Sequence, residues 1–169
     1  MTEVHSFAPI ARNDATCLIL GTMPGTASLA KHQYYGHRRN AFWPLLLDVL
    51  GLPADLDYDA RCEALRVHRI ALWDVLQCCR REGSLDSAID PESMQANDFA
   101  GFLARHPQIR RVYFNGQPAA RLWRALVHPT LPPALAALEC AVLPSTSPAH
   151  AAMTLAEKRQ RWHILRQQN

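Results

Sequence analysis

The sequence lacks any long apolar run. Its longest apolar stretch, near residue 45, is interrupted by Pro44 and Asp48 and is too short to span a bilayer. The start of the chain also lacks a basic segment followed by an apolar one, which is the pattern of a secretory signal. We therefore expect a cytoplasmic protein without membrane association.

Cysteine pairs at metal-binding spacing are missing as well. The five cysteines contain no C-x-x-C pair, Cys78 and Cys79 are adjacent, and an odd number does not suit a disulfide framework. The eight histidines show no ligand spacing. These absences predict free thiols in a reducing compartment, and no zinc or iron–sulfur site.

Lysine is scarce, since 16 of the 18 basic residues are arginine. The net charge of +3 hides an uneven distribution: it is −6 over residues 48–98 and +7 over residues 99–169. A basic segment rich in arginine suits a nucleic acid or another phosphate-bearing partner. The alternative is a solvated surface on which charges of both signs mix in three dimensions.

The 169 residues, 49% of them hydrophobic, are enough for one domain with its own core, and we expect a single domain over residues 1–169. Short apolar runs alternate with helical segments, which predicts an α/β fold with a parallel sheet covered on both faces. The expected strands are 16–20, 69–76, 111–114 and 139–143; the expected helices are 41–50, 59–68, 93–105, 117–127 and 154–167.

Three polar turns follow expected strands: Gly21–Gly25, Asn115-Gly116 and Pro144–Pro148. In a parallel sheet the ligand crevice lies beyond the carboxyl ends of the strands, so these turns should meet at one edge. The hydroxyls of the third turn suit a phosphate, although Ser and Thr also cap ordinary turns. Asn115 is equally typical of a turn before glycine.

The segment 34–43 places two tyrosines, a histidine, two arginines and an asparagine before Phe42-Trp43. Aromatic rings stack on bases and arginines hold phosphates, which is typical of nucleic-acid binding. Each residue also has a structural alternative: loop packing for Tyr34 and Tyr35, a loop hydrogen bond for His37, and a helix N-cap for Asn40.

These residues together resemble the uracil-DNA glycosylase superfamily. The run from Leu18 to Gly25 resembles its first motif, and Leu143 to Ala149 resembles its second. The segment from Tyr34 to Trp43 is similar to the loop of the branch that removes hypoxanthine, the base of deoxyinosine. In better-known branches an Asp or Asn stands in place of Met23 and a histidine in place of Leu143, and the hypoxanthine branch shares both departures. Arg38 replaces the proline that is usual there.

The resemblance implies a three-layer α/β/α sandwich around a four-stranded, mostly parallel sheet. It implies a monomer that hydrolyses the N-glycosidic bond of a flipped, deaminated base in DNA, with no metal or cofactor. Asn40 would be the catalytic residue. The implied base pocket comprises Met23, Gly25, Tyr34, Tyr35 and Asn115; Ser145, Thr146 and Ser147 would hold DNA phosphates, and His37 and Arg39 would support the loop.

The substrate stays open at this point. Hypoxanthine and uracil share a lactam edge that the Asn115 amide can bind, and a flipped amide would equally fit adenine or cytosine, so Asn115 does not decide the substrate. The resemblance favours hypoxanthine and allows uracil. Two alternatives remain: a mismatch-specific uracil or thymine glycosylase, and a non-catalytic reader of damaged DNA, which the missing acid at Met23 would suit.

Overall fold

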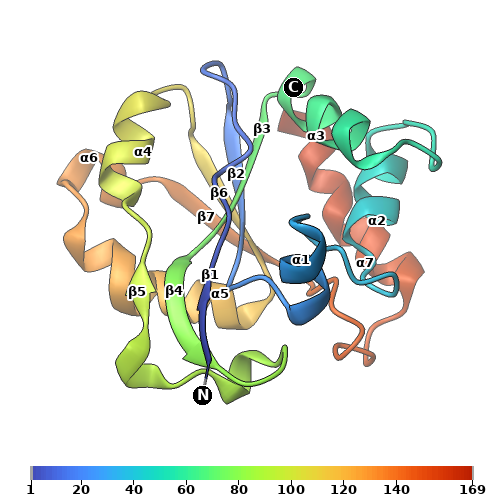
Figure 1. Cartoon of the computed structure of the whole chain (residues 1–169). Coiled ribbons are helices and arrows are strands. Elements are labelled where there is room, and N and C mark those ends of the chain that lie inside the picture. The colour runs from blue at the N-terminus through green and yellow to red at the C-terminus, as the bar shows by residue number, and fades with distance from the viewer. Residues whose placement is uncertain (1, 169) are drawn as a thin grey trace.

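The computed structural model describes residues 2–168 (Figure 1). Its central sheet has four parallel strands in the order β3-β2-β6-β7. The strands are β2 (Cys17–Gly21), β3 (Ile70–Asp74), β6 (Arg111–Asn115) and β7 (Glu139–Leu143). Every residue of β2 and β3 is buried, as expected for apolar strands with helices on both faces. The predicted four-stranded parallel sheet is confirmed.

Helices cover both faces of this sheet, so the predicted three-layer arrangement is also confirmed (Figure 1). Alternate side chains of β2 point to opposite layers: Ile19 packs with Phe42 and Trp162, and Leu18 packs with Phe102. One layer contains α2 (Phe42–Val49), α3 (Tyr58–Val67) and α7 (Leu155–Trp162). The other contains α4 (Phe99–Arg105), α5 (Gln117–Leu122) and α6 (Pro133–Ala136).

A second sheet was not expected from the sequence. It joins β1 (Thr2–His5), β4 (Leu76–Arg81) and β5 (Gln95–Ala96) in antiparallel order β1-β4-β5. The strand expected over 69–76 is present as β3, but its expected end at Leu76 was wrong, because β3 ends at Asp74 and Leu76 begins β4. The chain leaves the parallel sheet after Asp74, where the N–H of Val75 donates to the carbonyl of Gly21, and continues in the second sheet.

Several helix boundaries also differ from expectation. The helix expected over 93–105 begins only at Phe99, because the Asp98 side chain accepts the N–H of Gly101 and caps it there. The helix expected over 117–127 ends as α5 at Leu122 and continues as a π-helical turn. A short helix, α1 (Thr26–Lys31), follows the first glycine-rich turn and had no expected counterpart. The capping box of Thr154 and Glu157 at α7 is confirmed.

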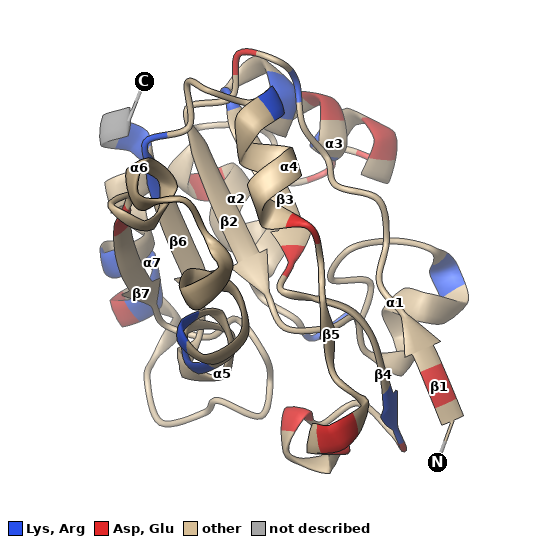
Figure 2. Cartoon of the chain, turned by 90° about the vertical axis from the view of Figure 1, so that its left-hand side faces the viewer, with Lys and Arg blue, Asp and Glu red and all other residues tan. Residues whose placement is uncertain are grey.

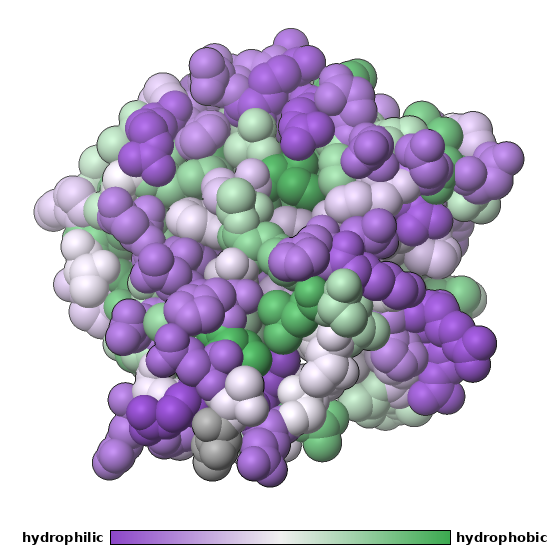
Figure 3. Space-filling view, viewed as in Figure 1, coloured by the Kyte–Doolittle hydropathy of each residue, from purple (hydrophilic) through white to green (hydrophobic). Residues whose placement is uncertain are grey.

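The surface carries few large apolar side chains. The face seen in Figure 3 is mainly hydrophilic, with small, separate apolar areas. Among the described residues, no helix combines the length and the apolar character needed to cross a membrane.

Candidate active site

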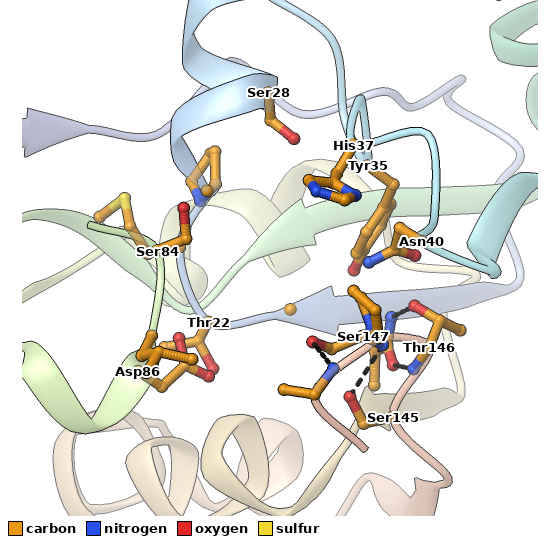
Figure 4. Close-up of a pocket in the computed structure, with 18 of the residues that line it drawn as sticks. Thr22, Ser28, Tyr35, His37, Asn40, Ser84, Asp86, Ser145, Thr146 and Ser147 are labelled. Carbon is orange, nitrogen blue, oxygen red and sulfur yellow. Dashed lines mark hydrogen bonds between the residues drawn. The ribbon is translucent and has the colours of Figure 1, made fainter. Parts of the chain in front are cut away.

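The three predicted turns meet at the carboxyl edge of the parallel sheet, where they line a cavity of about 570 Å³ (Figure 4). This volume lies within the range of about 300–1,000 Å³ that is usual for ligand sites. Of the predicted site residues, Arg39 alone does not line the cavity; the others do. The lining members are Met23, Gly25, Tyr34, Tyr35, His37, Asn40, Asn115, Ser145, Thr146 and Ser147.

The first turn presents an apolar wall. Met23 is only 7% exposed and packs with Leu76, Cys79 and Ile89. Its thioether offers neither a general base nor a strong hydrogen bond to water. In the hydrolysis that the resemblance implies, the attacking water would be held by another residue of the cavity.

The two tyrosines of the loop have different environments. Tyr34 is 4% exposed, and its hydroxyl donates to the carbonyl of Ala8 at 2.8 Å, so its ring belongs to the core. Tyr35 has a φ of 54° and stacks on Phe42 with ring centroids 4.1 Å apart. A left-handed backbone at a bulky residue costs about 1–3 kcal/mol and is found mainly at functional sites. The Tyr35 side chain points toward the middle of the pocket in Figure 4, which makes it the better candidate for contact with a base.

Asn40 lies at the mouth of the same cavity (Figure 4). Its Oδ1 accepts the N–H of Phe42 at 2.9 Å, although Ala41 is the N-cap residue of α2. The loop is held against the second motif, because the N–H of Ala41 donates to the carbonyl of Thr146 at 3.0 Å. Asn40 therefore orders the start of α2 with its oxygen, and its Nδ2 remains for a ligand or water.

His37 makes two hydrogen bonds within the loop, and the predicted supporting role of the Arg39 side chain stays a prediction. The N–H of Arg39 donates to Nδ1 of His37 at 3.1 Å, and the N–H of Asn40 donates to the His37 carbonyl at 2.9 Å. Both side chains are exposed, so the Arg39 guanidinium can meet a phosphate beside the cavity.

Asn115 connects the end of β6 to the second motif. Its Nδ2 donates to Oγ1 of Thr146 at 2.9 Å, and its Oδ1 accepts the Thr146 N–H at 3.0 Å (Figure 4). These two hydrogen bonds fix the orientation of the amide. One N–H and one oxygen lone pair remain, so pairing with a base edge stays a prediction.

The three hydroxyl residues of the second motif differ in burial. Thr146 is 1% exposed and is bonded to Asn115, so its side chain acts inside the turn. Ser145 and Ser147 are half-buried and line the cavity, and they are the better placed for a phosphate. Gly116, with φ of 95°, lets this turn approach the end of β6: a Cβ there would lie 3.1 Å from that of Ser145.

Asp74 is a cavity residue that sequence reasoning missed. The sequence predicts only a strand residue at this position, yet Asp74 lies at the carboxyl end of β3, pairs in register with Gly21 and is 4% exposed. Burial raises the pKa of its carboxyl to about 7. Its place at the end of an apolar strand was the available signal, because that edge of a parallel sheet forms the ligand crevice.

A buried arginine supports the wall formed by the first turn. Arg81 is 1% exposed, and its guanidinium donates to the carbonyls of Pro24 at 2.6 Å and Gly83 at 2.8 Å. Ser84 Oγ accepts the N–H of Thr26 at 2.9 Å. Asp86 also lines the cavity, and burial raises the pKa of its carboxyl. The segment 81–86 therefore fixes the first turn from behind.

Comparison with known proteins assigns the family. The profile of the Uracil DNA glycosylase superfamily matches residues 9–166. The chain belongs to this superfamily. Two curated relatives are each named hypoxanthine DNA glycosylase: one from Methanosarcina barkeri, 40% identical over 67% of this chain and 71% of its own, and one from Methanosarcina acetivorans, 38% identical over 68% and 72%.

A solved structure gives the same fold for a relative. The solution NMR structure of a candidate uracil DNA glycosylase from Methanosarcina acetivorans superposes with a TM-score of 0.78 at 32% identity. It covers 98% of this chain and 99% of its own. The enzyme class follows from the family: the chain is a DNA glycosylase, a hydrolase that acts on N-glycosidic bonds in DNA.

No metal cluster supports the glycosylase cavity within residues 2–168, where no group of three or more His, Cys, Asp or Glu side chains could hold an ion. The five cysteines are free.

We expect Gly21→Ala to damage both folding and the cavity. A Cβ at this position would lie 2.6 Å from Oδ1 of Asp74 and 2.8 Å from Oη of Tyr35, so both side chains would have to move. Overpacking of this kind costs about 1–3 kcal/mol. Urea unfolding should show that loss together with a more than tenfold slower excision, the scale expected when two cavity groups are displaced.

Gly51→Ala is the matched control for this change. Gly51 has a φ of 71°, but no atom lies within 4 Å of the added Cβ. It should lose stability through its backbone and keep the excision rate. A Gly21→Ala enzyme with normal activity would show that the crowding around Gly21 has no bearing on the site.

DNA binding should weaken with salt, and Arg39→Gln should reduce the slope of log affinity against log salt concentration by about one. The loop arginine is exposed beside the cavity, whereas Arg111 of the basic C-terminal segment is paired with Glu139 at 2.9 Å. Acidic residues are seen on α3 and on the segment between β4 and β5 (Figure 2). Arg111→Gln should leave the slope unchanged in fluorescence titrations, and a salt-independent affinity would contradict a phosphate interface.

Proposed function

We propose that this DNA glycosylase removes hypoxanthine from deoxyinosine-containing DNA, leaving an abasic site, and that uracil is a secondary substrate. The observation that carries the proposal is the position of Asn40, on a loop that lines the same cavity as the apolar Met23. The two curated relatives named hypoxanthine DNA glycosylase support the choice of base. The enzyme would act as a cytoplasmic monomer, and its free cysteines suit a reducing compartment.

The flipped nucleotide would enter between the loop and the second motif. A base inside the duplex stack is unreachable, so the target must rotate out into the cavity. Tyr35 would contact the base, the Asn115 amide would bind its lactam edge, and Ser145 and Ser147 would hold the flanking phosphates.

Asn40 would orient the water that attacks the sugar. Breaking the glycosidic bond builds positive charge on the sugar, so a neutral water molecule is nucleophilic enough to attack if it is well placed. An amide does not take up a proton at neutral pH, and its role is to position that water. Met23 offers no competing polar group.

The test is excision from labelled duplexes that contain inosine, uracil or a thymine mismatch, each followed by alkali. Strand breakage at inosine with a single-turnover rate above that for uracil is the expected result. Faster breakage at uracil or at mismatched thymine would overturn the substrate assignment in favour of the alternative glycosylases. Tight binding to all three duplexes without breakage would show a reader of damaged DNA instead.

A further inference from the structure

Asp74 is the cavity acid that the proposed roles leave unused. It lies at the end of β3 and pairs in register with Gly21 at the end of β2, so it is next to the start of the first turn. The residue is 4% exposed and lines the cavity. The cavity histidines His37 and His150, by contrast, are exposed at its rim.

The two carboxyl oxygens have different surroundings. Oδ1 lies close to the Cα of Gly21, where the Oη of Tyr35 also approaches; a Cβ on Gly21 would be 2.6 Å from the first and 2.8 Å from the second. Oδ2 has no hydrogen-bond partner among the described residues, and neither has the Tyr35 hydroxyl. The Asn115 amide lies near that hydroxyl without normal hydrogen-bond geometry.

A buried carboxyl without a partner is costly, because desolvation of a polar atom is not repaid by a hydrogen bond. The fold nevertheless makes room for it by keeping a side chain off Gly21. A surface site would solvate the group, and a structural site would pair it. A buried carboxyl that lacks a hydrogen-bond partner and lines a ligand cavity is suited to form a hydrogen bond with the bound substrate.

The charges around Asp74 favour its neutral form at moderate pH. Burial is the main reason that its pKa is raised to about 7; the Asp86 carboxylate raises it further, and the Arg81 guanidinium lowers it. Tyr34 and Tyr35 also face it and are themselves held neutral, since burial raises the pKa of both hydroxyls. A proton is therefore available on the carboxyl near neutrality.

The geometry points to Asp74 as the general acid that protonates the departing base, an inference that rests on the proposed function. The carboxyl would contact a ring nitrogen or the carbonyl oxygen of the flipped base. As the C1′–N bond breaks, its electron pair passes to the base and the proton of the Asp74 carboxyl neutralises that charge. The water held by Asn40 forms the new C1′–O bond, and the proton that it releases restores the Asp74 carboxyl through solvent.

This role accounts for features that a purely structural carboxyl would not need. An ionised Asp74 would repel the developing anion on the base, whereas a neutral carboxyl can donate to it. Asn40 and Asp74 then divide the reaction: one group places the nucleophile at the sugar, and the other activates the leaving group.

The first test uses the unmodified protein. Single-turnover excision of hypoxanthine should be constant at low pH and fall about tenfold per unit above about pH 7, because only the protonated carboxyl acts. A rate that stays constant from about pH 5 to about pH 9 would overturn the inference without any variant. If the wild type excises a different base, the same profile measured with that base tests Asp74 independently of the substrate assignment.

The second test is Asp74→Asn, which keeps the shape of the side chain but has no acidic proton. It should slow excision by about 100-fold or more, the usual scale of a lost general acid, and should abolish the decline above neutral pH. Asp90→Asn is the matched control, since Asp90 forms a surface ion pair with Arg80 outside the cavity, and its rate should be normal.

A substrate with a better leaving group separates chemistry from a merely structural effect. An inosine analogue whose base carries an electron-withdrawing group departs with less need of a proton, so the deficit of Asp74→Asn should shrink at least tenfold on it. Equal deficits on both substrates with an unchanged pH profile would contradict proton donation and leave Asp74 a structural residue.

Discussion

Asn40→Ala should reduce single-turnover excision by roughly 100-fold while duplex binding changes little, the scale of losing one well-placed catalytic group. Met23, which is 7% exposed, has no polar group that could hold the water in place of Asn40. The hydroxyls assigned to phosphates, Ser145 and Ser147, lie on another segment and are untouched by the change.

The same substitution also removes a structural hydrogen bond, and this loss has to be separated from the catalytic one. Oδ1 of Asn40 accepts the Phe42 N–H at 2.9 Å, and losing such a capping interaction costs about 0.5–2 kcal/mol of folding free energy. Thermal melting measured on the kinetic samples gives that cost and the folded fraction.

Asp57→Ala is the matched control for the structural part. Asp57 caps α3 by accepting the N–H of Ala60 at 2.9 Å and lies outside the cavity. It should lower the melting temperature by a similar amount and keep the excision rate of the folded protein. If Asn40→Ala behaves like this control, Asn40 is a helix-capping residue and the catalytic assignment fails.

Asp74→Asn should make the protein more stable at pH 8 and leave its stability nearly unchanged at pH 4. Burial raises the pKa of this carboxyl from 3.8 to about 7, so the folded state prefers the protonated form. Below about pH 4 both states hold the proton and no penalty exists. As the pH rises toward 7 the unfolded state ionises first, and stability falls by about 1.4 kcal/mol per unit until the folded carboxyl also ionises.

Removing the acid removes this penalty, which amounts to at most about 4 kcal/mol above neutral pH. Urea unfolding at pH 4 and pH 8 measures it. Asp90→Asn is a control of opposite sign, because the hydrogen bond from Arg80 lowers the pKa of Asp90 and the substitution should cost stability at pH 8. An Asp74→Asn protein that gains nothing at pH 8 would mean that the carboxyl ionises there as it does in water.

Local patterns in the sequence were sufficient to predict the parallel sheet and to predict the site at its carboxyl edge. Apolar runs such as Leu18-Ile19-Leu20 form buried strands in any parallel sheet, and the turns after them must share the carboxyl edge. The antiparallel sheet could not be read in this way. The run Leu76–Arg81 continues directly from β3, and only its pairing with β1 and β5 distinguishes it from the strand before it.

Neighbouring residues of similar type have different environments in the folded chain, and the sequence does not distinguish them. Tyr34 and Tyr35 are neighbours in one polar loop, yet one is bonded to Ala8 in the core and the other reaches the cavity from a left-handed backbone. Ser145, Thr146 and Ser147 likewise differ in burial, because Thr146 alone is tied to Asn115. Contacts between segments more than 25 residues apart decide both cases.

The sequence by itself determined the four segments of the parallel sheet, the three turns and the loop that carries Asn40, since these follow from residue spacing and turn chemistry along the chain. The tertiary structure alone decided the condition of Asp74. Its neighbours Gly21, Tyr35 and Arg81 come from three separate segments, and only their packing excludes water from the carboxyl and raises its pKa. The burial of a side chain depends on the segments that pack around it, and the local sequence at that position does not specify them.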